Sequence, residues 1–447
     1  MNNGGFFQVI AGFFVIISNY VFSQNPIITD QFSADPSARV FEGKVYLYPS
    51  HDILANEERG RIGWFCMSDY HVFSSENLVD WTDHGVIVSQ NKVPWVDSTS
   101  YSMWAPDCIY RNGKYYFYFP AREKDGESRR GMGIGVAISG KPYGPFVPRP
   151  KPIKGVRGID PNVFIDKDGQ AYLYWSARNM YVAKLQDNMP ELASEPMAID
   201  NLPQKGLKEG PFMFERNGIY YFTYPHVEDS TERLEYAMGD HPMGPFKVTG
   251  VIMDQRLDCW TNHHSIVEYK NQWYLFYHYN DLSPHFDKNR SVRIDSMFFN
   301  QDGTIRKVTP TLRGVGITEA TRKIQIDRYS CISRNGASVT FLNPNNTFEG
   351  WKTILASEDA WIQYNSVDFE SREFKLVKIR ARSEEGGVIQ IKLNNIEGIV
   401  MARVEIPAGN DWTTVKALVS GLKAGVKNLV ISSIDNTTVE VDWISFE

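Results

Sequence analysis

Three acidic residues occupy matching positions in a recurring segment of the chain, and their types and spacing suit them to chemistry. Asp35, Asp160 and Glu209 each precede an aromatic strand by a nearly constant interval. Trp104 and His263 take the same position in the two remaining copies of the segment. Like charges that are close together and partly buried shift one another's pKa values, which separates a proton donor from a proton acceptor. These residue types therefore indicate acid–base chemistry.

The recurring segment is a turn followed by a strand rich in Tyr, Phe and Trp, and successive copies lie 49 to 70 residues apart. The five copies are residues 43–48, 112–118, 168–175, 217–222 and 271–277. Asn-Gly and Asp-Gly pairs in the turns favour tight hairpins, because both central residues of a two-residue type I′ turn adopt positive φ. A short apolar run precedes each turn, so each copy predicts a β-hairpin with room for two further strands.

Five such units predict an all-β fold, a five-bladed β-propeller of four-stranded blades over residues 24–316. The innermost strand of every blade begins at one end of the central channel, so equivalent positions converge there. Counting back from the turns, these positions are Asp35, Trp104, Asp160, Glu209 and His263. We therefore expect the five side chains to meet in one cavity. A β-sandwich would not predict regular repetition of one hairpin.

Carboxyl groups placed across a channel suit the hydrolysis of a glycosidic bond. We assign Asp35 as the general base, and Glu209 as the general acid because its longer side chain reaches the glycosidic oxygen. The negative charge of Asp160 is expected to hold the proton on Glu209. A carboxyl separation of roughly 6.5 to 9.5 Å would admit water and give inversion of configuration. Trp104 is expected to stack on the sugar, and His263 to contact the substrate or a hard cation such as calcium.

The stretches around these residues resemble glycoside hydrolase family 43, the five-bladed propeller arabinofuranosidases and xylosidases. They are residues 34–37 (ADPS), 104–107 (WAPD), 158–161 (GIDP), 208–211 (KEGP) and 263–266 (HHSI). The resemblance covers residues 26–316 and implies the same three carboxylate roles, an inverting mechanism and a calcium ion near the histidine. It also implies that Arg293 binds sugar hydroxyls. Asn262 departs from the family pattern, in which many members have Gly before the histidine.

Two further motifs concern the substrate. Ser50-His51-Asp52 and Tyr70-His71 resemble family members that act on xylan and arabinoxylan, so we expect His51 and Asp52 to contact the sugar. Removal of terminal β-D-xylose and removal of α-L-arabinofuranose both remain open. The same machinery would also suit a β-galactosidase or an endo-arabinanase. A non-catalytic sugar-binding propeller is a further alternative, although it would not require both an acid and a base.

Residues 320–447 lack the aromatic hairpins and predict a separate β-sandwich. This part resembles a family 6 carbohydrate-binding module, in which Trp351 and Trp412 would be the pair that stacks on sugar. Glu440 stands where such modules usually have a sugar-binding Asn. A purely structural role for the sandwich is therefore the alternative.

The remaining sequence features concern the location of the protein and its binding partners. The 447 residues carry a net charge of −6 with no basic stripe, which argues against a nucleic-acid partner. Residues 1–23 predict a signal peptide, because the apolar run at 6–17 is too short to span a bilayer, and no later segment is long enough. We expect a secreted or periplasmic protein without an organic cofactor, acting on plant polysaccharide. The four cysteines allow either disulfides or buried free thiols.

Overall fold

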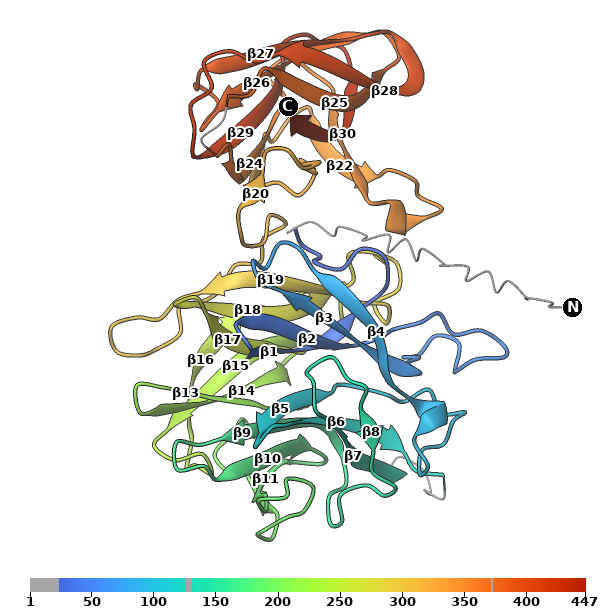
Figure 1. Cartoon of the computed structure of the whole chain (residues 1–447), viewed down its shortest axis with the longest axis vertical. Helices are drawn as coiled ribbons and strands as arrows, with labels where there is room; N and C mark the ends of the chain where they lie inside the picture. Colours follow the sequence, from blue (N-terminus) through green and yellow to red (C-terminus); the bar gives the residue numbers. More distant parts are fainter. Residues whose placement is uncertain (1–23, 125–130, 371–372) are drawn as a thin grey trace, which may run out of the picture.

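The computed structural model describes residues 24–124, 131–370 and 373–447, so the predicted signal peptide lies outside the described residues. Two all-β units follow one another along the chain (Figure 1). The first contains five small antiparallel sheets, and the second contains two larger sheets. No helix in the described ranges reaches the length and hydropathy needed to cross a bilayer.

Each small sheet is one blade, and its strands lie in sequence order. Blade 1 contains β1 (Ala34–Phe41), β2 (Lys44–Ser50), β3 (Asp69–Ser75) and β4 (Thr82–Ser89). Blade 2 contains β5 (Asp107–Arg111), β6 (Lys114–Arg122), β7 (Met132–Ser139) and β8 (Val147–Pro148). Blade 3 contains β9 (Ile159–Ile165), β10 (Ala171–Ser176), β11 (Met180–Lys184) and β12 (Met197–Ala198). Blade 4 contains β13 (Phe212–Arg216), β14 (Ile219–Val227), β15 (Glu232–Gly239) and β16 (Lys247–Met253). Blade 5 contains β17 (Ser265–Tyr269), β18 (Gln272–Tyr279) and β19 (Ser291–Met297).

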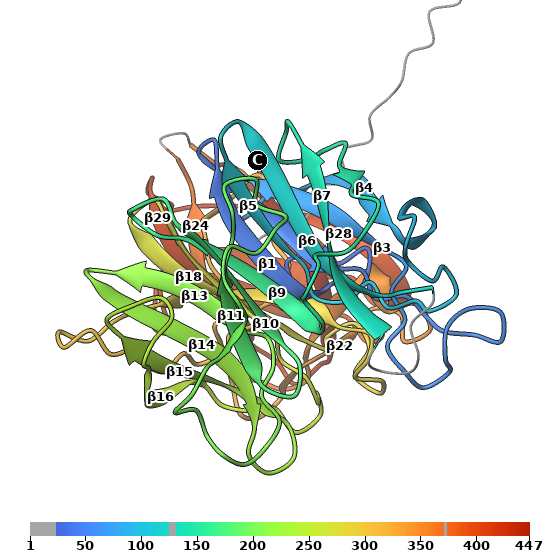
Figure 2. The same ribbon diagram turned by 90° about the horizontal axis from the view of Figure 1, so that it is seen from below.

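The first strands of the blades form a closed ring. β1 contacts β5, β5 contacts β9, β9 contacts β13, β13 contacts β17, and β17 returns to β1. Figure 2 looks along the long axis of the molecule, with these propeller strands in front of the sandwich. The prediction of a five-bladed propeller is confirmed, and the first strand of each predicted hairpin is the innermost strand of its blade.

The fifth blade has three strands in the described residues, whereas four were predicted for every blade. The chain before β1 runs along β19 at this point. The amide of Ile27 donates to the carbonyl of Val292, and the amide of Ser33 donates to that of Arg290, both at 2.9 Å. The N-terminal segment therefore closes the ring by joining the last blade to the first.

The aromatic residues that reveal the repeat pack between blades. Each pair of neighbouring blades shares one buried apolar cluster, and the second strands of the blades supply its large rings. Tyr48 packs on Phe117 between blades 1 and 2, and Tyr174 packs on Phe222 between blades 3 and 4. The high aromatic content thus reflects blade packing first, since flat rings fill the space between twisted sheets.

The hairpin turns follow the predicted chemistry in four blades. Paired positive φ values occur at residues 42–43, 112–113, 217–218 and 270–271, as a two-residue type I′ turn requires. The third copy differs, because Gly169 has positive φ but Asp168 does not. The amide of Gly169 donates to the carbonyl of Asp166 at 2.9 Å, which closes a longer turn over residues 166–169.

The second unit is a β-sandwich. One sheet contains β20 (Thr318–Glu319), β24 (Trp361–Asp368), β29 (Val426–Ser433), β26 (Gly387–Leu393) and β27 (Val400–Ile406), with β21 (Cys331–Ile332) paired to β24. The other contains β22 (Ala337–Phe341), β23 (Trp351–Leu355), β30 (Val439–Phe446), β25 (Leu376–Ser383) and β28 (Gly409–Leu418). Alternating apolar residues of both sheets form one core.

Polar contacts join the sandwich to the propeller. Arg322 pairs with Asp80 at 2.6 Å, and the Thr347 hydroxyl donates to the carbonyl of Leu282 at 2.7 Å. The Arg328 guanidinium donates to the carbonyl of Asn25 at 3.2 Å. The four cysteines are free thiols, three of them buried and Cys331 exposed.

Candidate active site

The carboxylates predicted from the repeat lie at the starts of inner strands. Asp35 is the second residue of β1 and Asp160 the second of β9, and both have left-handed backbone, with φ of 46° and 54°. Each precedes a proline and sits at a register shift of its hairpin. Non-glycine residues rarely adopt this backbone conformation, and β-bulges redirect side chains. Backbone strain of this kind is found mainly at functional sites, which supports a functional role for Asp35 and Asp160. Glu209 lies just before β13, at the same end of its blade.

Asp35 is held as an ionised carboxylate. Its two oxygens accept hydrogen bonds from Arg290, Nη1 to Oδ1 at 2.7 Å and Nη2 to Oδ2 at 3.1 Å. Burial alone would raise the pKa of Asp35, but the positive charge of Arg290 and the smaller effects of His278 and His263 together outweigh burial and lower this pKa to about 2. Asp35 therefore stays negative and can accept a proton from water.

Asp52 and His278 hold Arg290 and Asp35 in position by hydrogen bonds. Asp52 is 1% exposed and accepts three hydrogen bonds from Arg290, from its backbone amide at 2.8 Å and from Nε and Nη2 at 2.9 Å each. Burial lowers the pKa of His278 to about 3, so the ring is neutral. Its Nδ1 accepts from the Asp35 amide at 3.1 Å, which leaves Nε2 to donate to the Thr261 carbonyl at 3.0 Å.

Glu209 and Asp160 have the opposite electrostatic character. Burial and the negative charge of Asp35 raise the pKa of Glu209 above its ordinary value, against the opposing effect of neighbouring hydrogen bonding and of Arg290. Burial first, and then the charge of Glu209, raise the pKa of Asp160 well above its ordinary value. Asp160 Oδ2 accepts the amide of Gly210 at 3.0 Å. Gly210 has φ of 58° beside the His263 ring, where a side chain would crowd that ring.

A fourth carboxyl group, Glu232, joins the cluster from the first residue of β15. It is 2% exposed, and burial together with the charge of Glu209 raises its pKa well above the ordinary value. A side-chain hydrogen bond links Glu232 to Glu209 and lowers the pKa of Glu209. Glu232 Oε2 also accepts the amide of Asn262 at 2.6 Å. Glu232 is therefore a neutral acid that donates to Glu209.

The two non-acidic members of the predicted set also lie at this end of the channel. His263 Nδ1 stands 4.0 Å from Asp35 Oδ1, and burial lowers the pKa of this imidazole, so it is neutral. Trp104 is partly buried against the cluster between blades 1 and 2. Among the described residues its Nε1 is buried and has no hydrogen-bond partner.

Three partly exposed aromatic residues stand beside the carboxylates. The rings of Phe65 and Trp260 are stacked 6.0 Å apart, and Trp64 lies 6.1 Å from Trp260. The guanidinium of Arg290 lies 4.8 Å from the centre of the Phe65 ring, which connects this aromatic group to Asp35. Flat apolar rings of this kind are suited to the faces of sugar rings.

Three residues predicted to bind substrate have other partners, and the first is Asp52, which is buried and bound to Arg290. Arg293 is buried on β19, ion-paired with Asp281 and 4.9 Å from the Tyr279 ring, so the arginine that joins the carboxylates is Arg290. His51 lies at the end of β2 with its Nδ1 2.7 Å from Asp69 Oδ1.

The structure does not bring the predicted aromatic pair of the sandwich together. Trp351 on β23 and Trp412 on β28 belong to one sheet, with β30 and β25 between their strands. Trp351 stacks on Phe341 and lies 3.7 Å from the Arg328 guanidinium, next to the propeller junction. The guanidinium groups of Arg380 and Arg382 each lie 5.0 Å from the centre of the Trp412 ring.

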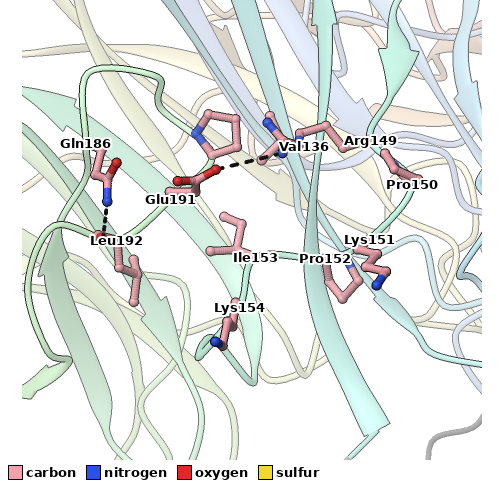
Figure 3. Close-up of a pocket in the computed structure, with 11 residues that line it drawn as sticks. Val136, Arg149, Pro150, Lys151, Pro152, Ile153, Lys154, Gln186, Glu191 and Leu192 are labelled. Atoms are coloured by element: carbon pink, nitrogen blue, oxygen red, sulfur yellow. Dashed lines mark hydrogen bonds and ion pairs between the residues drawn. The ribbon is translucent and has the colours of Figure 1, made fainter.

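Two surface hollows lie away from this cluster. A cavity of about 440 Å³ between blades 2 and 3 is lined by residues 149–154 and 190–192 (Figure 3). A second, of about 310 Å³, lies at the opposite end of the channel and is lined by the far ends of the inner strands. Neither contains any of the carboxylates, so the site is defined by its converging charges rather than by cavity size.

His264 is a better candidate than His263 for binding an ion in the channel. His264 Nε2 lies 2.6 Å from the Thr223 hydroxyl, while its buried Nδ1 has no partner among the described residues. Both side-chain amide atoms of Asn262 are unpartnered in the same way. Buried polar atoms without partners suit water or a hydrated cation, and calcium takes the amide oxygen and waters as ligands.

Sequence reasoning missed Glu232, Arg290 and His278. None of them is in an innermost strand, so the repeat position that identifies Asp35 and its equivalents does not apply to them. Glu232 begins the third strand of blade 4, and Arg290 immediately precedes the third strand of blade 5. The signal that would have found them is their position at the same end of the outer strands.

Residues 23–305 match the family described as glycosyl hydrolases family 43, and residues 336–447 match carbohydrate binding module family 6. The chain is 41% identical to a xylosidase/arabinosidase of Humicola insolens, over 63% of this chain and 98% of that protein. It is 26% identical to an arabinoxylan arabinofuranohydrolase of Bacillus subtilis, over 91% of this chain and 88% of that protein. A solved β-xylosidase/α-arabinofuranosidase from a compost microbial metagenome, a calcium-free complex with xylotriose, is 35% identical with a TM-score of 0.56, over 64% and 97% of the two chains.

Proposed function

The chain belongs to glycosyl hydrolase family 43, and on this premise we propose that it removes terminal β-D-xylose or α-L-arabinofuranose from xylan or arabinoxylan with inversion. The observation that carries the proposal is the contrast between the carboxyl groups of Asp35 and Glu209. Arg290 lowers the pKa of Asp35 to about 2, whereas burial raises the pKa of Glu209. The proton affinities of the two groups thus differ in the direction that a base and an acid of glycoside hydrolysis require.

In the proposed reaction Asp35 removes a proton from a water molecule, and that water attacks the anomeric carbon. Glu209 donates its proton to the departing glycosidic oxygen, so the bond to the leaving sugar breaks as the bond to water forms. Both oxygens of Asp35 are bound by Arg290, which orients the carboxylate to accept a proton rather than to attack carbon itself. Asp160 and Glu232 adjust the proton affinity of Glu209.

The sugar is proposed to bind between Trp104 and the wall formed by Trp64, Phe65 and Trp260. The aromatic faces would hold the pyranose or furanose ring. Names of the similar proteins support this substrate class, since two of them are a xylosidase/arabinosidase and an arabinoxylan arabinofuranohydrolase.

A panel of aryl glycosides and short oligosaccharides tests the proposal. We expect release of xylose or arabinose, and at least ~10²-fold loss of kcat on xylobiose for Glu209→Gln and Asp35→Asn, because acid–base catalysis contributes about this much. Glu215→Gln, on the adjacent strand and paired with Lys167, is the matched control and should retain activity. Unchanged turnover in both site variants would contradict the proposed roles. Proton NMR of the first-formed anomer tests inversion, and β-galactosides and arabinan in the panel test the alternatives.

Three further properties are proposed. Export rests on the apolar run at residues 6–17, and N-terminal sequencing of protein from the medium or periplasm tests it.

Calcium is proposed to bind in the channel at His264 and Asn262, where it would supply positive charge and ordered water beside the carboxylates. The sandwich is proposed to bind polysaccharide, because its family consists of carbohydrate-binding modules, and pull-down on insoluble xylan with Trp412→Ala tests this.

A further inference from the structure

Two histidines and an aspartate converge on the first blade, beside the active site but outside its carboxylate cluster. His51 follows the end of β2, while Asp69 and His71 lie on β3. The His51 Nδ1 is 2.7 Å from Asp69 Oδ1, and the His71 Nε2 is 4.0 Å from the same oxygen. All three candidate ligand atoms lie within 4.8 Å of one another. Each side chain is 16–20% exposed, so the group is reachable from solvent.

A second layer of hydrogen bonds orients these side chains. His71 Nδ1 is 3.0 Å from a carboxylate oxygen of Asp83 on β4, which leaves Nε2 facing Asp69. Asp83 is itself held by the amide of Gly85 at 2.7 Å, and Asp69 Oδ2 accepts the Ser68 hydroxyl at 2.6 Å. Histidines that bind metals commonly donate their other ring nitrogen to a carboxylate, which fixes the tautomer.

We propose that His51, Asp69 and His71 form a binding site for a divalent transition-metal ion of the zinc class. Two imidazoles and one carboxylate suit Zn²⁺ rather than calcium or magnesium, which prefer oxygen ligands. Ligand atoms around a tetrahedral ion with bonds of about 2.0–2.1 Å stand about 3.3 Å apart. The distances of 2.7 and 4.0 Å lie on either side of this value, so small side-chain movements complete the site. Water takes the fourth position.

The location gives the ion a defined structural effect. His51 is adjacent in the chain to Asp52, which holds the guanidinium of Arg290. An ion that binds His51 to β3 therefore fixes the end of β2 next to the residue that orients Arg290. This site is separate from the proposed calcium position, which involves His264 and Asn262 in the channel.

The test uses the full chain, freed of metal with a chelator and titrated with ZnCl₂ by isothermal calorimetry in the presence of excess Ca²⁺. We expect one zinc ion per chain, and at least ~10-fold weaker binding in His71→Ala and Asp69→Asn, since each removes a ligand. Asp83→Asn keeps all three ligands and should weaken binding by roughly 10- to 100-fold through loss of orientation. Because Co²⁺ reports coordination directly, the visible absorption of the cobalt form should show four-coordinate nitrogen and oxygen ligation.

His84→Ala is the matched control, because His84 is an exposed histidine on the same blade that contacts Ser74 and lies outside the group. It should bind zinc as the unaltered protein does. Circular dichroism of each variant shows whether the fold is retained. The proposal is overturned if folded protein binds no zinc at ~100 µM, or if His71→Ala and Asp69→Asn bind as tightly as His84→Ala. Either result would mean that the group is a hydrogen-bonded network without an ion.

Discussion

Substitutions of Glu232 test whether this residue acts on Glu209 as a hydrogen-bond donor or as a negative charge. The two roles predict opposite shifts in the pH dependence of catalysis. Burial and the adjacent Glu209 raise the pKa of Glu232 well above its ordinary value, so Glu232 is neutral at working pH and donates to Glu209. A hydrogen bond to a charged group contributes roughly 1.5–3 kcal/mol. This corresponds to about 1–2 pKa units, since one unit is about 1.4 kcal/mol.

Glu232→Met removes the donor while roughly conserving volume, so the ionised form of Glu209 loses stabilisation and the pKa of Glu209 rises. Glu209 acts as the acid and must be protonated, so the alkaline limb of kcat/KM should move up by about 1–2 pH units. Glu232→Gln retains a donor and should leave this limb close to its original position. The substrate should be xylobiose, whose poor leaving group makes protonation important.

The control is Glu235→Gln on the same strand, where a buried carboxylate contacts His226 and Arg233 instead of the catalytic group. Its limb should not move. Glu232→Met also leaves the Asn262 amide without its acceptor, so thermal unfolding is measured to confirm that the variant folds. An alkaline limb that stays in place or moves down in folded Glu232→Met would refute the reasoning, because it would mean that Glu232 acts as a repelling charge.

Other variants probe the remaining charges. Arg290→Lys cannot bind Asp35 and Asp52 bidentately, so kcat should fall by about 10²-fold, and the acid limb should move up as the pKa of Asp35 rises from about 2. Burial raises the pKa of Asp160, so folding at neutral pH carries the cost of keeping this carboxyl group in its disfavoured environment. Asp160→Asn removes that cost, so at neutral pH the Tm should rise by about 2–4 °C while kcat falls, and unchanged Tm would contradict this. The lowered pKa of Asp35 contributes stability above pH about 4 that is lost as pH falls through about 2, so Asp35→Asn should flatten acid unfolding measured by circular dichroism over that range.

The sequence predicts those parts of the fold and of the site that recur in every copy of the repeat. The hairpins, the propeller and the shared position of Asp35, Trp104, Asp160, Glu209 and His263 follow from one periodic signal. Blade 5 has three strands in the part of the chain that the structure describes, and no repeat signal predicts this, because the N-terminal segment lies along β19 there. The partners of the carboxylates come from outer strands and connections of unequal length, where position in the sequence does not predict position in space.

The division of labour between acid and base arises from those unrepeated partners. Asp35 and Glu209 occupy equivalent positions in a nearly symmetric ring, so the inner strands alone would give them similar proton affinities. Of these two catalytic residues, Arg290 is hydrogen-bonded to Asp35 and Glu232 to Glu209, and neither Arg290 nor Glu232 lies in an inner strand. A positive charge lowers one pKa, and burial without a direct ion pair raises the other. The propeller therefore brings equivalent residues together, and asymmetric neighbours make them chemically different.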